Sequence, residues 1–206
     1  SANFNVGVGY QSLTSTTSGG NNVGLGAQAL YSNTTASNNT AVGYQAGYFN
    51  TFGTNISAFG WSALYSNTTG YSHTLIGYQA GYSTSTGTSV TAVGQSAAYN
   101  NTTGSYIAAL GEGALQFNTT GSSNVAVGQK SLYSNTTGAL NTAIGYLALN
   151  ANTTASYNTA VGYQAAYSNQ TSTLTAVGNQ ALYSSTVNNT AVGYRALYTT
   201  STGANN

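Results

Sequence analysis

The sequence predicts an all-β fold, a parallel β-solenoid (β-roll) of twelve stacked coils with about 17 residues per coil. One glycine recurs every 17 residues from Gly9 to Gly162, and again after 16 and 15 residues at Gly178 and Gly193. The phrase N-T-A-V-G, with small variations, surrounds that glycine each time. The rest of the chain is rich in Gly, Asn, Thr, Ser and Tyr, which disfavours helix and favours short strands and turns.

The repeat unit reads roughly N-T-A-V-G-Y-Q-A-L-Y-S-N-T-T-G-S-N, and we number its positions as columns 1 to 17, with the recurring glycine in column 5. Stacked repeats place equivalent residues one above another, so each column is a row along the solenoid. We expect residues 1–206 to form a single repeat array, as a segment of a longer fibre. The units start at Asn5, Asn22, Asn39, Ile56, His73, Val90, Ile107, Asn124, Asn141, Asn158, Leu174 and Asn189.

Each unit is expected to contain strands at "TAVG" and "QALYS" and a turn at "NTTGSN". The two short units lose residues in "SNQTSTL" and "SSTVNN", which indicates that shortening is tolerated in the turn and not in the strand phrase. Coils that hydrogen-bond to one another at a spacing of about 4.8 Å would make a rod roughly 55–60 Å long.

Column 4 is never polar, so we predict that it forms the core, where each buried side chain contributes about 1.5–3 kcal/mol. Columns 3 and 8 are nearly all Ala, with Leu75 as the lone large residue, which indicates close backbone approach. The invariable glycine of column 5 indicates a backbone angle closed to other residues, or a corner with no room for a Cβ. Column 4 holds Val8, Leu25, Val42, Phe59, Ile76, Val93, Leu110, Val127, Ile144, Val161, Val177 and Val192.

Column 1 alternates between Asn and aliphatic residues such as Ile56 and Val90, with His73 once. A column that accepts both Asn and Ile is expected to be sheltered. Columns 1 and 4 lie on opposite faces of a strand, and a thin coil has one interior, so a second chain would cover the other face. We therefore expect a homo-oligomer, a closed trimer, with Asn stacked as amide ladders. The alternative is a monomeric coil whose Asn column lies at an inside corner.

The composition argues against catalysis, because the chain has one Glu, no Asp, no Cys, and His73 as its single imidazole. Metal sites need clustered carboxylates or Cys and His, so we expect no metal and no cofactor. The cations, Lys130 and Arg195, are too few to bind nucleic acid. The apolar runs are only a few residues long, so no membrane span is expected.

The phrases "NVAVG" at Asn124–Gly128 and "NTAIG" at Asn141–Gly145, with the "NTAVG" copies, resemble the head repeats of trimeric autotransporter adhesins. The longer unit, with the consensus "YQALYSNTTG", looks like the repeat arrays of phage tail-fibre and bacterial surface-fibre proteins. The resemblance implies a trimeric, left-handed parallel β-roll displayed outside the cell, with the aliphatic residue of "AVG" buried. This chain has a longer unit than the adhesin heads and almost no charge.

These observations predict a structural fibre or stalk segment of an extracellular filament, a surface adhesin or a phage tail fibre, without catalysis. We expect it outside the cell, on a cell surface or a virion surface. Neither end of the sequence reads as a cap, so we expect self-association, as a trimer, an end-to-end filament or both.

Column 10 is mostly Tyr and offers an alternative function, in which the rings form a surface that binds glycans or a receptor. The competing interpretation is that these tyrosines stack on one another, with their hydroxyls in water. The candidate ligand surface is Tyr31, Tyr48, Tyr65, Tyr82, Tyr99, Tyr133, Tyr167, Tyr183 and Tyr198.

Columns 12 to 14 repeatedly spell the acceptor sequence for Asn-linked glycans, which would place sugars in a line on exposed turns. Asn and Thr are also simply turn formers. The same Thr-rich turns raise a third function, ice binding, although neighbours such as Thr68 and Thr69 point opposite ways on a strand. The candidate glycosylation sites are Asn33, Asn67, Asn101, Asn118, Asn135, Asn152 and Asn169.

Overall fold

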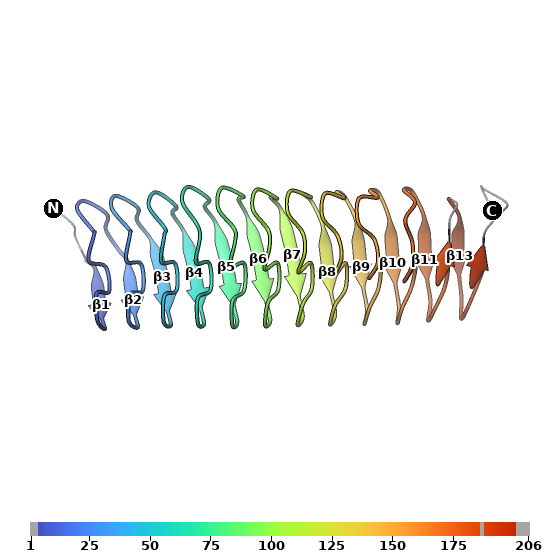
Figure 1. Ribbon diagram of the computed structural model, residues 1–206, viewed down its shortest axis with the longest axis horizontal. Coiled ribbons are helices and arrows are strands. Elements are labelled where there is room, and N and C mark those ends of the chain that lie inside the picture. The colour runs from blue at the N-terminus through green and yellow to red at the C-terminus, as the bar shows by residue number, and fades with distance from the viewer. Residues whose placement is uncertain (1–3, 186–187, 201–206) are drawn as a thin grey trace.

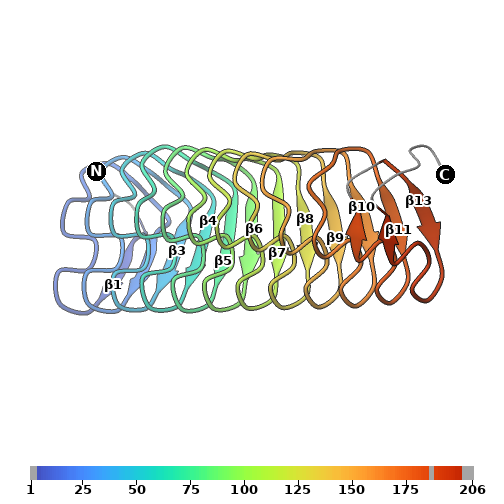
Figure 2. The ribbon, with the colours of Figure 1, turned by 45° about the vertical axis from the view of Figure 1, so that its right-hand side comes forward.

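The computed structural model describes residues 4–185 and 188–200 and confirms the parallel β-solenoid. Within these residues, each coil adds one strand to a twelve-stranded parallel sheet, and the strands follow chain order along the rod (Figure 1). The coils repeat one outline along the axis (Figure 2). The strands of this sheet are β1 (Val6–Val8), β2 (Val23–Leu25), β3 (Asn39–Val42), β4 (Ile56–Phe59), β5 (His73–Ile76), β6 (Val90–Val93), β7 (Ile107–Leu110), β8 (Val125–Val127), β9 (Thr142–Ile144), β10 (Thr159–Val161), β11 (Thr175–Val177) and β13 (Thr190–Val192).

The pairing keeps each column in register from coil to coil. Val42 of β3 pairs with Phe59 of β4, one full unit later. The register also holds in the two short units, because Ala160 pairs with Ala176 and Ala176 with Ala191. The residues missing from these units are therefore lost outside the sheet, as the sequence predicted.

The expected second strand, "QALYS", is wrong for most coils. Columns 7 and 9 have positive φ, as at Gln28 (59°) and Leu30 (51°), so the chain bends here at a cost of roughly 1–2 kcal/mol per non-glycine residue. The N–H groups of columns 7 and 9 in this arc point along the axis in opposite directions, and the N–H of column 8 between them bonds within its own coil, as from Ala29 to the carbonyl of Gly26. Gln28 donates to the carbonyl of Tyr10 in the preceding coil, and Leu30 donates to that of Ala46 in the following coil. Only the last coils described have a second, two-stranded sheet, β12 (Ser184–Ser185) with β14 (Thr199–Thr200).

The prediction that column 4 forms the core is also wrong for the single chain. Ile76 is 42% exposed and Ile144 is 39% exposed, whereas Ala41 and Leu64 are fully buried. Side chains alternate between the two faces of a strand, so columns 1 and 3 point into the coil and columns 2 and 4 point out. Apolar residues of columns 1, 3, 8 and 9 form the buried cluster, which runs the length of the rod.

The glycine of column 5 meets both conditions that the sequence indicated. Gly128 has φ of +126°, which L-residues with a side chain rarely adopt. A Cβ at this position would lie 2.6 Å from the carbonyl oxygen of Gly145 in the next coil. Stacked coils therefore touch through their backbones at this corner.

Candidate functional site

The tyrosines of column 10 form a continuous stack over five coils. The ring centroids of successive pairs lie 5.0, 5.2, 4.9 and 5.1 Å apart, and the ring planes are within 13° of parallel. A second stack covers the last three described coils, with centroid distances of 5.1 and 5.0 Å. The five-ring ladder is Tyr31, Tyr48, Tyr65, Tyr82 and Tyr99, and the three-ring ladder is Tyr167, Tyr183 and Tyr198.

Stacking leaves little free ring face inside these ladders. A sugar packs on the face of an aromatic ring, and the faces of Tyr48, Tyr65 and Tyr82 are occupied by the rings of neighbouring coils. The ring stacking that the competing interpretation of this column requires is therefore present in both ladders. Partial burial raises the pKa of Tyr65 and Tyr82, so both remain phenols at neutral pH.

Tyr133 is the predicted site residue that joins neither ladder. Gln116 and Asn150 occupy column 10 in the coils on either side of it. Its ring instead forms a T-shaped pair with that of Phe117, with the centroids 5.0 Å apart and the planes at 89°. The sequence-predicted surface is therefore two tyrosine ladders and one separate tyrosine.

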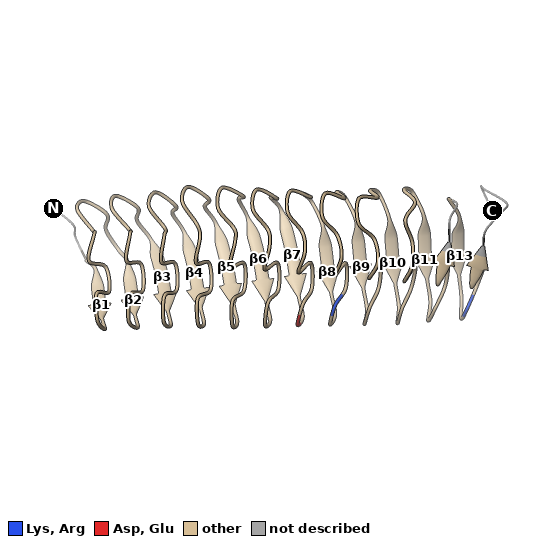
Figure 3. Ribbon diagram, in the orientation of Figure 1, with Lys and Arg blue, Asp and Glu red and all other residues tan. Residues whose placement is uncertain are grey.

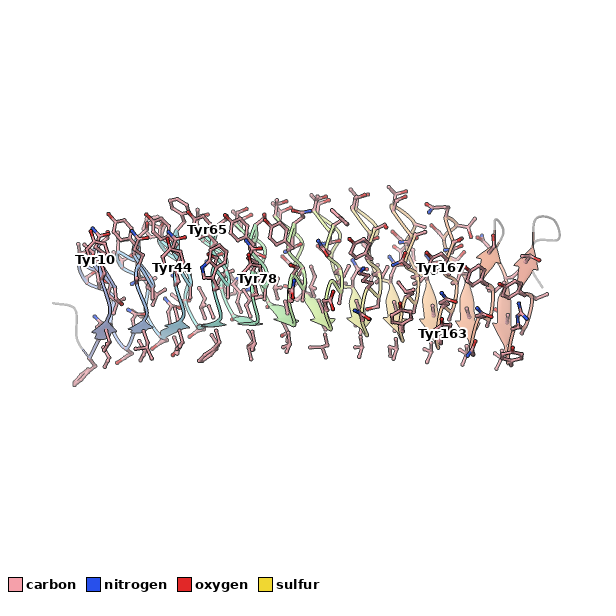
Figure 4. All side chains as sticks on the ribbon, turned by 60° about the horizontal axis from the view of Figure 1, so that its bottom comes forward. Tyr10, Tyr44, Tyr65, Tyr78, Tyr163 and Tyr167 are labelled. Carbon is pink, nitrogen blue, oxygen red and sulfur yellow. The ribbon has the colours of Figure 1, made fainter. Side chains whose placement is uncertain are left out.

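Column 6 carries a more exposed set of aromatic rings. Tyr44, Trp61 and Tyr78 stack at 5.8 and 5.0 Å, and each is between 43% and 49% exposed. Tyr146 and Tyr163 stack at 5.5 Å further along the rod. Figure 4 shows that the side chains repeat in rows from coil to coil. Column 6 follows the turn at column 5, so these rings border the outward face of the sheet.

The charged residues lie along one edge of the rod (Figure 3). Lys130 Nζ lies 5.5 Å from the ring centroid of Tyr133, and the Arg195 guanidinium lies 4.2 Å from that of Tyr198. Each cation therefore contacts a tyrosine of its own coil, a contact that contributes about 0.5–1 kcal/mol at exposed sites. Glu112 accepts a hydrogen bond of 2.8 Å from Gln129 Nε2 of the next coil.

The seven candidate glycosylation asparagines do not lie on exposed turns, and that expectation is wrong. All of them, in column 12, have fully buried side chains. Asn135 Nδ2 donates both to Asn118 Oδ1 of the preceding coil, at 2.7 Å, and to the Gly138 carbonyl of its own coil, at 2.9 Å. A buried amide must find such partners, and stacking supplies them. The buried sites are Asn33, Asn67, Asn101, Asn118, Asn135, Asn152 and Asn169.

Column 1 also lies inside the coil, which is where the monomeric alternative placed it. Asn39 Nδ2 donates to the Gly53 carbonyl at 2.9 Å, and its Oδ1 accepts from the backbone N–H of Ile56 at 3.1 Å. Asn39 Nδ2 also donates to Asn33 Oδ1 of column 12, at 3.4 Å. The column 1 amides do not bond to one another, because their oxygens accept from backbone N–H groups of the following coil, so the amide-to-amide ladder expected for this column does not form. An aliphatic residue such as Ile56 packs in the same buried row.

His73 replaces Asn in column 1 and keeps the hydrogen bond that Asn makes to the following coil. Its Nδ1 accepts from the backbone N–H of Val90 at 3.3 Å, as the Asn oxygen does elsewhere. Burial lowers the pKa of His73 to about 4, so the ring is neutral at physiological pH. Across residues 4–185 and 188–200, no three His, Cys, Asp or Glu side chains come together in a cluster that could hold a metal ion.

The threonine hydroxyls of column 13 serve the backbone. Thr102 Oγ1 donates to the Thr119 carbonyl at 2.9 Å, and Thr119 Oγ1 donates to the Thr136 carbonyl at 3.0 Å. The column 13 hydroxyls, which form the regular row nearest the turn, therefore donate their hydrogen bonds within the rod. Ice binding stays a prediction that rests on the more exposed threonines of column 14.

In the part of the chain that the structure describes, no helix has the length and apolar character needed to cross a membrane. Neither a protein-family model, nor a curated protein, nor a solved structure matches this chain.

Proposed function

We propose that this chain is the structural shaft of an extracellular fibre, in which copies associate side by side through the outward face of the twelve-stranded sheet. The observation that carries the proposal is column 4, a straight row of one half-buried or exposed aliphatic or aromatic side chain per coil. Exposed apolar residues scattered singly are normal, but a continuous row is typical of an interaction surface.

The outward strip spans columns 2 to 6 and has the size of an interface. Twelve coils at about 4.8 Å, and four residue steps at about 3.3 Å, give a strip of roughly 55 Å by 13 Å. Its area, roughly 700 Å², is close to the ~800 Å² that each partner buries in a standard interface. A single-chain shaft would leave this surface in water.

A second copy of this chain fits the strip best. Any copy presents similar side chains at the same coil spacing. A contact made at one coil can therefore be repeated at each of the remaining coils. The strip contains one formal charge, Glu112 in column 6, so like-charge repulsion between copies is small. The closed trimer, which the resemblance to adhesin heads implies, is the arrangement that we propose.

The rod suits a mechanical role. Backbone hydrogen bonds run between successive coils along its length, and the buried Asn amides of column 12 add a parallel line of bonds. The chain has no Cys, so no change of thiol oxidation state can alter it, and it has few groups that titrate near neutral pH. These properties favour a shaft that keeps its length outside the cell. The covered ring faces of column 10 favour this function over glycan binding.

The test places charge on the outward strip. Val93→Asp, Val127→Asp and Val161→Asp in one variant put three carboxylates on column 4, two coils apart. Because these side chains point out of the coil, the single chain should keep its fold, measured by circular dichroism. The assembled mass, measured by light scattering, should fall from several chains to one.

The matched control carries the same charge elsewhere. Thr69→Asp, Thr103→Asp and Thr137→Asp place three carboxylates, also two coils apart, on the exposed column 14. This variant should retain the assembled mass. A parent protein that is monomeric at every concentration, or a column 4 variant that still assembles, would contradict the proposal.

A further inference from the structure

We propose that the five-ring tyrosine ladder, Tyr31 to Tyr99 in column 10, is a site of oxidative modification. A one-electron oxidant, such as a peroxidase with hydrogen peroxide, would join tyrosines of adjacent coils as dityrosine. The inference concerns bonds within one chain. It is therefore independent of whether copies associate side by side.

The composition directs oxidation to these rings. The sequence has no Cys and no Met, the sulfur side chains that are commonly oxidised first. It has 18 Tyr and one Trp. The chain therefore cannot form disulfide cross-links, whereas its tyrosines can form cross-links by coupling of their phenol rings.

The geometry holds potential partners together. Neighbouring rings in the ladder have centroids 4.9–5.2 Å apart and nearly parallel planes. The coil backbone fixes this spacing, so two radicals formed on adjacent rings stay in contact. Each ring is partly exposed, which gives a small oxidant access and lets the rings pivot toward one another. Coupling is thus an intrachain reaction between positioned groups.

The chemistry balances as follows. Each of two neighbouring tyrosines loses one electron and its phenolic proton and becomes a phenoxyl radical. The radicals pair to form a carbon–carbon bond between ring positions ortho to the oxygens. The two ring protons at that bond then move to the oxygens, which restores both phenols. Two electrons and two protons leave in total, and they convert one hydrogen peroxide into two waters.

The chain contains its own controls. Tyr133 lies in the same column but has Gln116 and Asn150 in the neighbouring coils. Tyr106 and Tyr157 are 66% and 61% exposed, more than the ladder tyrosines, and neither stacks on another ring of the described coils. If stacking directs coupling, these three tyrosines should stay uncoupled within the chain. If exposure alone directs it, Tyr106 and Tyr157 should react first.

The experiment treats the full chain, at low concentration, with a peroxidase and hydrogen peroxide. Dityrosine is detected by its fluorescence, and the joined peptides are identified by mass spectrometry after digestion with a protease of broad specificity. We expect intrachain pairs one coil apart in the ladder, such as Tyr48 with Tyr65. Absence of dityrosine, or pairs that follow exposure, would overturn the proposal.

Two double variants distinguish the effect of ring stacking on dityrosine formation from the effect of the number of tyrosines. Tyr48→Phe with Tyr82→Phe keeps every ring stacked but leaves Tyr31, Tyr65 and Tyr99 without a phenol on either side. The coupled peptides of this segment should disappear while the far-ultraviolet circular dichroism stays unchanged. Tyr106→Phe with Tyr157→Phe removes as many tyrosines and should leave the ladder pairs intact. If the two double variants lost equal amounts of ladder dityrosine, a role for ring stacking in the coupling would be refuted.

Discussion

Leu75 fills the space that Gly81 leaves empty inside the same coil. A Cβ on Gly81 would lie only 2.8 Å from Leu75 Cδ2, and Leu75 is fully buried. Most other coils have the reverse arrangement, with Ala in column 3 and Leu in column 9, as at Ala58 and Leu64. The interior therefore accepts one large side chain at this level, from either of two columns.

This exchange predicts a strong coupling between the two positions. Leu75→Ala should cost about 2–5 kcal/mol of unfolding free energy by leaving a cavity, and Gly81→Leu should destabilise by overpacking, typically about 1–3 kcal/mol. The double variant should recover most of the loss, because Leu64 shows that column 9 accepts Leu at a similar φ, 53°. Urea unfolding of the four proteins gives the coupling energy, and additive effects would contradict this account.

Gly128→Val should prevent folding of the surrounding coils. The φ of Gly128 and the nearby carbonyl of Gly145 both exclude a side chain. Gly113→Gln is the control, because Gly113 lies in column 7, where Gln is the usual residue. It should change the thermal midpoint little. If both variants melted alike, the backbone contact between stacked glycines would not be essential.

Thr84→Asn should stabilise the rod. Thr84 interrupts the column 12 ladder, so within the described coils Asn67 Oδ1 is buried with no hydrogen-bond partner, as is Thr84 Oγ1. The new amide would donate to Asn67 Oδ1 and accept from Asn101 Nδ2, which together should add roughly 1–3 kcal/mol. Thermal unfolding measures the gain. Thr84→Val, which supplies no amide, should leave Asn67 Oδ1 unpaired and give no comparable gain from the ladder.

His73 should make the stability of the rod depend on pH. Burial lowers the pKa of His73 from 6.5, the ordinary value of an exposed histidine, to about 4 in the folded chain, so only the unfolded chain takes up a proton between these values. Stability should therefore be constant above about pH 7 and fall by about 3 kcal/mol as the pH drops from 6.5 to 4. Equilibrium unfolding at several pH values tests this.

His73→Asn supplies the matched comparison. It restores the usual residue of column 1, with an oxygen for the Val90 N–H, and it removes the titrating group. With one Glu and no Asp in the sequence, the variant should show a nearly flat profile over the same range. If the stability of both proteins fell equally steeply with pH, the pH dependence would come from groups other than His73.

The repeated glycine predicted the coil length, the stacking and the register of the sheet from the sequence. The Asn residues of column 12 were harder to interpret. A turn former on the surface and a laddered amide in the interior have the same local sequence, "NTTG", because the partners that permit burial come from the neighbouring coils. The stacking of Tyr31 to Tyr99 was one of two interpretations, and only the ring separations in the folded chain distinguish them.

The sequence by itself determined that the chain folds as a repetitive parallel β-solenoid, because equivalent residues at a constant interval can all be satisfied by stacking one coil on the next. Only the tertiary structure decided which face of the strand is inside. Columns 1 and 3 lie on one face of the strand, and columns 2 and 4 lie on the other. Both pairs alternate with the same period of two residues, so periodicity alone cannot show which pair faces the interior. The interior of a 17-residue coil is narrow. It takes the Ala, Asn and Leu columns and leaves the branched residues of column 4 outside.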